Sequence, residues 1–496
     1  MLAALKRLSG DTLIYGTSTV VSRFLTFLLV PFYTNLLAPG ELGVYSAIYS
    51  WIAFVSIVFT YGMEAAYFRF AADSVNDKKK FSAPFITLLG SSLFFAVIIV
   101  ALKPVLNEFV NPYHTVASST MNTIVVCSVS ILFFDALSIL PFAALRLQHK
   151  PARFAVLRFI NIFLQVVLNL LFVAFLHYGV AGIFLGNAIA SVATFIIILP
   201  TIRGLFAWTY SRAIMREFLG FGLPYVPSSL STIALQVIDR PIMQRLTNDP
   251  TVGIYSANYR LGTIMMVFVS MFEYAWRPFF LQYARQPDAK RVFSRVLTYF
   301  TLAAAAIFLI VSFFVGDLAR IVIWNHHSII DRRYWGGLTI VPIVLAAYIF
   351  NGFYTNFIVG IYVEKRTRLL PVITGVAALS NIIGNLIMIP IFGIAGAAWA
   401  TFISYALMAV MIYRMTQPFY PMQYEWGRIG KIASVTLGAF LLSSIAQNFA
   451  AGAAMQLMNV LLLALTGAAF FFLKFFSPGE LSGMQGMLRG FIIRAK

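Results

Sequence analysis

Two arginines stand inside otherwise apolar stretches of the sequence, Arg23 in STVVSRFLTFLLV and Arg260 in GIYSANYRLGTIMMV. An ionised side chain at the middle of a bilayer costs at least about 2.5–3.5 kcal/mol, so such residues face water or the interior of a helix bundle. The planar guanidinium donates paired hydrogen bonds to phosphate oxygens. We therefore predict that both arginines bind a phosphate-bearing ligand. An interhelical ion pair for Arg23 and a snorkelling side chain for Arg260 are the alternatives.

Asp239 and Arg240 are neighbours in QVIDRPIMQR, near the end of another apolar stretch. Successive residues of a helix point about 100° apart, so we expect the two side chains not to pair with each other. Arg240 is then a further candidate for binding the ligand, with a cation at the level of the lipid headgroups as the alternative. Asp239 is a candidate gating residue.

Asp135 lies in SILFFDALSILP, flanked by aromatic residues. A carboxyl group removed from water favours its neutral form, so Asp135 could bind and release a proton and is a candidate coupling site. The alternative is that Asp135 is a structural partner for an arginine such as Arg23.

Glu64 and Glu273 occupy equivalent places at the ends of two apolar segments, and each is followed by an arginine, Arg69 or Arg277. One interpretation is an inner gate that opens and closes between the two segments. The other is a local ion pair in each segment, at the membrane surface.

Pro224 and Pro227 interrupt the segment GFGLPYVPSS. A proline inside a membrane helix frees a backbone carbonyl and permits bending, so we predict a hinge there. No GxxxxGK[ST] pattern for phosphate binding by an ATPase occurs. His326 and His327 lack the further ligands that a metal site needs, and we predict neither a metal nor an enzymatic activity.

The composition indicates which kind of structural element carries these residues. The chain has 496 residues, of which 60% are hydrophobic and 11% charged, whereas a soluble protein carries about 25% charged residues. The apolar runs are long enough for spanning helices, and we expect an all-α polytopic membrane protein with about fourteen of them. The predicted spans are 12–37, 43–68, 82–103, 118–146, 153–177, 179–202, 217–244, 252–276, 294–316, 336–362, 368–390, 393–415, 429–448 and 454–476.

The basic residues, which dominate a net charge of +19, gather at alternate ends of these spans. One side receives Lys78 to Lys80 and a group of four that we place at a helix end, Arg146, Lys150, Arg153 and Arg158. By the positive-inside rule this side is cytoplasmic, and both termini lie there. The charge then reflects topology and contact with anionic lipids, so we expect no nucleic-acid partner.

The sequence repeats itself. GVYSAIYS at 43–50 matches GIYSANYR at 253–260, with Ser50 opposite Arg260, and Asn169 aligns with Asn385. We predict two parallel, pseudo-symmetric six-helix bundles at 1–210 and 211–420, with two extra helices and a tail at 421–496. Transporters built from such repeats bind substrate where the repeats meet. Two similar repeats of which only the second carries the arginine would suit an asymmetric ligand.

Several stretches resemble bacterial polysaccharide or O-antigen flippases of the multidrug, oligosaccharidyl-lipid and polysaccharide exporter superfamily. They are GDTLIYGTSTVVSRFLTFLLVPFYTNLLAPGELGVYS, YGMEAAYFRF, DRPIMQRL with VGIYSANYRLG, and FGIAGAAWAT. The resemblance implies alternating access and an undecaprenyl-diphosphate-linked oligosaccharide as cargo, carried across the bacterial inner membrane. It also places Arg23 and Arg260 in the central cavity. It leaves open a proton gradient, a sodium gradient or no ion coupling.

Alternatives stay open within and beyond this superfamily. A lipid II flippase would show a further arginine in the second helix, where Ser50, Ser56 and Thr60 stand. A multidrug antiporter would need an acidic, aromatic pocket for a cation. A polymerase or ligase would need a large outer loop with acid and base residues. We expect a monomer that works among membrane lipids, with the polysaccharide polymerase machinery as a candidate partner and no cofactor.

Overall fold

The computed structural model describes residues 29–324, 327–449, 452–473 and 475. Within them, 13 helices are long and apolar enough to cross a membrane. The predicted all-α membrane fold is confirmed. Most of the first predicted span, including Arg23, lies outside the described residues.

The chain forms two compact units, residues 1–281 with 319–415 and residues 282–318 with 416–496. The boundaries differ from the predicted ones, because the first unit holds most of both predicted bundles. The division at 210 and 420 therefore stays a prediction.

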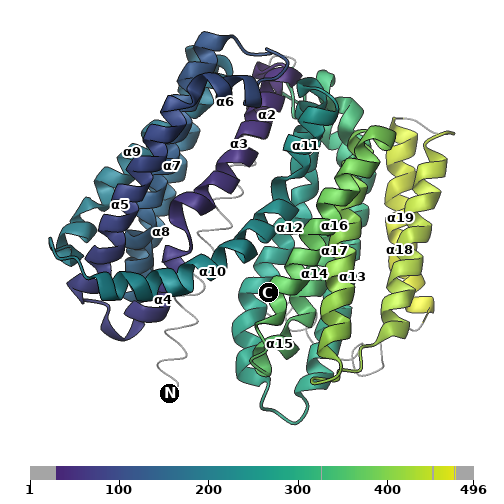
Figure 1. Ribbon diagram of the computed structural model, residues 1–496. Helices are drawn as coiled ribbons and strands as arrows, with labels where there is room; N and C mark the ends of the chain where they lie inside the picture. The colour runs from purple at the N-terminus through teal and green to yellow at the C-terminus, as the bar shows by residue number, and fades with distance from the viewer. Residues whose placement is uncertain (1–28, 325–326, 450–451, 474, 476–496) are drawn as a thin grey trace, which may run out of the picture. The chain divides into compact units, whose positions relative to one another are not determined.

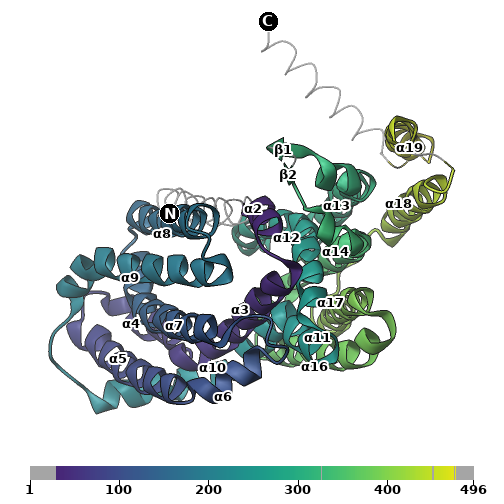
Figure 2. The same cartoon turned by 90° about the horizontal axis from the view of Figure 1, so that it is seen from above.

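The amino-terminal part of the first unit contains helices that pack side by side around α7 (Figures 1 and 2). Its elements are α2 (Val30–Leu36), α3 (Pro39–Thr60), α4 (Met63–Ala71), η1 (Ala72–Ser74), α5 (Lys78–Ala101), α6 (Lys103–Val110), α7 (Ser118–Leu147), α8 (Pro151–Asn169), the π-helical turn η2 (Leu170–Phe175) and α9 (Gly179–Leu205).

The rest of the first unit begins with α10 (Arg212–Val237) and α11 (Asp239–Leu246). It continues with α12 (Asp249–Tyr283), the short antiparallel pair β1 (Val322–Trp324) and β2 (His327–Ser328), η3 (Arg332–Ile340), α14 (Val341–Phe357), α15 (Val359–Val363), α16 (Leu369–Phe392) and α17 (Ile394–Thr416). Both views show α12, α14, α16 and α17 gathered together (Figures 1 and 2).

The second unit is built from α13 (Ala289–Arg320), α18 (Trp426–Ala446) and α19 (Ala453–Phe472). A buried asparagine joins all three helices. The Asn459 amide donates to the Phe313 carbonyl at 3.1 Å, and its oxygen accepts from the Ser443 hydroxyl at 2.7 Å. Phe313 and Leu462 add an apolar contact nearby. The two extra helices thus pack on α13 within this unit.

One predicted helix, 43–68, is broken in the structure. The α3 helix ends at Thr60, Tyr61 and Gly62 adopt positive φ angles of 30° and 76°, and α4 begins at Met63. The break lies where α10 crosses, and a β-carbon on Gly62 would collide with the Gly222 backbone. The predicted helix 217–244 is likewise two helices, α10 and α11, separated at Ile238.

The α10 helix contributes to two different cores. Its first half buries Met215 and Phe218 among residues of α4, α5 and α7, whereas its second half packs against α16. Figure 1 shows the helix crossing beneath the amino-terminal helices and then turning upward towards α11. Pro224 and Pro227 lie between these parts, and the helix continues through both. A hinge there stays a prediction.

Candidate functional site

The repeated glycines of GVYSAIYS and GIYSANYR lie where the two copies meet. A β-carbon on Gly43 would collide with the Asp249 carbonyl, and one on Gly253 would collide with the Pro39 carbonyl. Only glycine permits backbones to approach so closely. The repeat therefore supplies the first turns of α3 and α12 with surfaces that fit each other.

Hydrogen bonds reinforce the contact at the same end of these helices. The Thr115 hydroxyl donates to the Asp249 carboxylate at 2.5 Å, and the Tyr113 hydroxyl donates to the Thr247 carbonyl at 2.7 Å. The Tyr334 hydroxyl donates to the Leu37 carbonyl at 3.0 Å. We call this set of contacts the closed end. Asp249 is fully buried within it and also accepts from Gln244 at 2.7 Å.

Arg260 lies two turns along α12 from Gly253, just inside the closed end. Its guanidinium stands 5.7 Å from the centre of the Tyr33 ring and 5.6 Å from that of Tyr45. An arginine of the second repeat thus contacts an aromatic cluster of the first. In the part of the chain that the structure describes, Arg260 forms no ion pair with Asp or Glu.

The expectation that Asp239 and Arg240 do not pair is wrong. Arg240 donates to the Asp239 carboxylate at 2.8 Å, and their side chains are 12% and 4% exposed. The pair forms because the helix is interrupted at Ile238, which makes Asp239 the first residue of α11 and lets its carboxylate also accept from the Arg240 backbone amide at 3.0 Å.

Tyrosines complete this cluster. The Tyr255 hydroxyl donates to Asp239 at 2.5 Å, and the Arg240 guanidinium lies 4.5 Å from the Tyr259 ring centre. The charge of Arg240 is therefore already neutralised in a buried network.

The two predicted gating glutamates have different partners. Glu273 pairs with Arg277 at 3.0 Å, as one of the two interpretations expects. Glu64 instead pairs with Arg146 of α7. The expected pair of Glu64 with Arg69 is wrong, because the Arg69 guanidinium stacks on the Phe221 ring of α10 at 5.0 Å. Glu64 therefore joins two helices, and Glu273 stays within one.

Asp135 lines a cavity of about 490 Å³ between α3, α7, α8 and α9. Arg158 lines the same cavity, together with Asn161 and Gln165. Arg158, which the charge pattern groups with the basic residues of a cytoplasmic helix end, thus faces a cavity between helices, and its side of the membrane stays a prediction. The spacing of 158, 161 and 165 on one face of a helix is a signal that could have revealed the polar face.

A second cavity, of about 300 Å³, lies among α10, α12, α14, α15 and α16. Glu273 and Arg277 line it beside Trp276, Asn351 and Thr374. At the spacing that aligns Asn169 with Asn385, Asn351 corresponds to Asp135 and Thr374 to Arg158. The two cavities are thus related by the repeat, and the pair of residues that is charged in the first is neutral in the second.

The comparison with known sequences identifies the family. The chain matches the family described as "Polysaccharide biosynthesis protein" over residues 8–284, which is more than half of its length. The chain belongs to this family. The family suggested by the sequence resemblance is thereby confirmed. No curated protein matches the sequence.

Solved structures of other proteins share the fold of this chain. The lipid II flippase MurJ in an inward closed conformation superimposes with a TM-score of 0.70 at 14% identity, covering 93% of this chain and 98% of MurJ. An inward-facing multidrug resistance MATE family transporter of the MOP superfamily gives 0.63 at 15%, covering 83% and 96%. A MOP superfamily transporter from Pyrococcus furiosus gives 0.55 at 15%, covering 87% and 96%. At these identities the likeness is one of fold.

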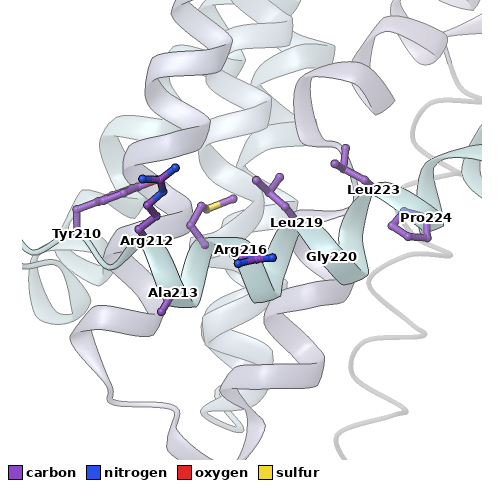
Figure 3. A pocket seen from close by; sticks show the side chains of 9 residues that line it. Tyr210, Arg212, Ala213, Arg216, Leu219, Gly220, Leu223 and Pro224 are labelled. Atoms are coloured by element: carbon purple, nitrogen blue, oxygen red, sulfur yellow. The ribbon is translucent and has the colours of Figure 1, made fainter.

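The first half of α10 also carries a basic groove (Figure 3). Arg212 and Arg216, one turn apart, line a hollow of about 920 Å³ together with Tyr210 and Leu219. Trp208, 85% exposed, precedes them. Basic and aromatic side chains together are typical of the membrane–water interface. The groove fits a position at the lipid headgroups.

Within the residues described here, no group of three or more His, Cys, Asp or Glu side chains could hold a metal ion. Cys127 is buried and free. The candidate site comprises Arg260 and the residues that line the two cavities.

Proposed function

We propose that the protein flips an undecaprenyl-diphosphate-linked oligosaccharide from the cytoplasmic to the periplasmic leaflet of the bacterial inner membrane by alternating access. The observation that carries the proposal is Arg260, a cation inside the membrane fold that contacts both repeats and forms no ion pair among the described residues. Such a residue suits a diphosphate, which needs donors and positive charge in an apolar surrounding.

The closed end would then be the periplasmic gate. The contacts that form it come from connections that the positive-inside rule places outside. Glycine contacts and a few hydrogen bonds join the two repeats at this end. In this proposal the diphosphate binds Arg260 from the cytoplasmic side, and separation of Gly43 from Asp249 releases it.

The paired charges would serve as gates. In the structure Glu64, Glu273 and Asp239 each pair within their own repeat, and gating would exchange these partners for groups of the other repeat. Pro224 and Pro227 would let α10 bend, so that each half moves with the helices against which it packs. The basic groove of Arg212 and Arg216 would contact anionic headgroups at the cytoplasmic surface.

Deletion of the gene in the producing cells tests the direction of transport. We expect loss of surface polysaccharide and accumulation of lipid-linked repeat units that membrane-impermeant reagents reach only from the cytoplasmic side. Accumulation of units already exposed to the periplasm would contradict the proposal and point to a polymerase.

A lipid II flippase is the second candidate, because the MurJ superposition spans nearly the whole of both chains. Loss of cell-wall synthesis on deletion, with surface polysaccharide intact, would favour it. The two readouts come from the same deletion strain, so one culture separates the candidates.

A further inference from the structure

The cavity that Asp135 and Arg158 share is a polar space inside one repeat. Its volume is about 490 Å³, within the range of roughly 300–1,000 Å³ that is usual for small-molecule sites. Ser56 and Thr60 of α3 line one side of it, where a lipid II flippase would carry an arginine. The proposed functional residue Arg260 does not line it.

Asp135 and Arg158 interact electrostatically, and each also has a partner of its own. Asp135 interacts with the Ser191 hydroxyl. The Arg158 guanidinium stacks on the Phe142 ring at 4.5 Å and lies 5.7 Å from the Phe154 ring centre. Within the described chain, neither Asp135 nor Arg158 forms an ion pair. The carboxylate and the guanidinium that line the cavity can therefore each form further hydrogen bonds, to a ligand.

Two amides continue the polar face along α8. The Asn161 amide donates to the Thr194 hydroxyl at 2.7 Å, and the Gln165 amide donates to the Asn161 oxygen at 3.2 Å. These contacts fix the orientation of both side chains. The cavity therefore presents four planar polar groups, namely one carboxylate, one guanidinium and two amides, beside the Phe142 ring.

The charges decide which ligand fits. With one negative and one positive group the cavity is neutral overall, so a bare cation is opposed by Arg158 and a bare anion by Asp135. A hydroxyl group both donates and accepts a hydrogen bond, and several on one ring can satisfy a carboxylate, a guanidinium and amides together. We propose that this cavity binds a neutral, hydroxyl-rich sugar residue of the transported oligosaccharide. The inference rests on the proposed function and assigns the sugar to Asp135 and Arg158, apart from the diphosphate at Arg260.

The repeat supplies a built-in comparison. Asn351 and Thr374 take the places of Asp135 and Arg158 in the smaller cavity of about 300 Å³. The charged groups that line that cavity, Glu273 and Arg277, pair with each other at 3.0 Å, and neutral side chains stand at the two equivalent positions. Sugar recognition is then confined to the first repeat, and the second repeat offers control positions in the same architecture.

Two lipids separate sugar binding from diphosphate binding. One probe is undecaprenyl diphosphate, and the other is the lipid-linked oligosaccharide extracted from cells that lack this protein. Equilibrium binding is measured with the full-length protein in lipid nanodiscs. We expect Asp135→Asn and Arg158→Gln each to raise the Kd for the sugar-bearing lipid about tenfold or more, since each removes hydrogen bonds to a charged group. The Kd for undecaprenyl diphosphate should stay within about twofold.

Matched variants distinguish a loss of sugar binding from a folding defect. Gln165→Leu removes a neutral amide without leaving a charge unpaired, and we expect it to weaken only the sugar-bearing lipid, by several-fold. Thr374→Val, at the position equivalent to Arg158, should change neither Kd. Size-exclusion profiles of all variants should match that of the wild type.

Equal losses for the two lipids, or no loss for either, would overturn the inference. So would an Asp135→Asn variant that loses only the pH or sodium dependence of flipping, which would make Asp135 a coupling residue. Wild-type protein that binds both lipids equally would overturn the sugar assignment alone. Wild-type protein that binds neither lipid would overturn the proposed function as well.

Discussion

At the scale of single residues, Arg260 differs from three other arginines discussed for the site. Arg146, Arg240 and Arg277 each pair with a carboxylate, and Arg240 is in addition buried among tyrosines. A paired arginine contributes little net charge to a ligand, whereas Arg260 presents its full charge beside two tyrosine rings. This difference is why Arg260 is assigned to the diphosphate in preference to Arg240.

The buried pair of Asp239 and Arg240 makes a prediction about stability. Asp239→Asn removes the charge that neutralises Arg240 and weakens the bond from Tyr255. Breaking a buried ion pair by removing one partner costs roughly 3–5 kcal/mol. We expect a clear drop in the thermal unfolding temperature of the purified protein, measured by differential scanning fluorimetry.

Asp331→Asn is the matched control, because Asp331 pairs with Arg333 at 2.8 Å with side chains 25% and 46% exposed. Exposed pairs contribute about 0–1 kcal/mol, so this variant should melt within a degree or two of the wild type. Equal unfolding temperatures for both variants would show that the Asp239 pair is not the buried network described.

The partner of a charged side chain could be predicted from the sequence only where that partner lies close by in the chain. The pair of Glu273 with Arg277 follows from their spacing, and it is present. The partner of Glu64 lies on another helix, so spacing suggested Arg69 in place of Arg146. The charge pattern groups Arg158 with basic neighbours at a cytoplasmic helix end, and hydropathy does not show that its side chain meets a cavity.

At the scale of elements, the crossing of α3 and α12 decides whether the closed end can form. Gly253→Ala puts a methyl group where the Pro39 carbonyl lies. We expect the helices to separate there, which a pair of spin labels at the exposed residues Val105 of α6 and Leu246 of α11 would report as a longer distance by double electron–electron resonance.

Gly90→Ala serves as the control, since a β-carbon at Gly90 meets no atom within 4 Å. Its distance distribution should coincide with that of the wild type. A Gly253→Ala distribution that also coincides with the wild type would contradict the role of the glycines in closure.

Element positions were largely predictable, and their interruptions were not. Hydropathy located the spanning segments because each is a continuous apolar run, and 13 of them appear among the described residues. The breaks at Gly62 and Ile238 depend on crossings and caps with distant segments, such as Gly222 against Gly62. No local pattern contains that information.

At the scale of the whole molecule, the fold class and family followed from composition, the internal repeat and the sequence resemblance. The packing of α18 and α19 with α13 did not, because all three read as ordinary apolar helices. Their association depends on Asn459, which bonds to Ser443 and to the Phe313 carbonyl. The sidedness of the membrane and the two-bundle division stay predictions.

Transbilayer movement of a fluorescently labelled lipid-linked oligosaccharide in proteoliposomes tests the central claim most directly. We expect the wild type to flip this lipid. Arg260→Ala should flip it at least about tenfold more slowly, because a charge-assisted bond to phosphate is lost. The control is Arg320→Ala, which removes an exposed arginine over Trp335 and should match the wild type. Flipping by Arg260→Ala at the wild-type rate would contradict the account.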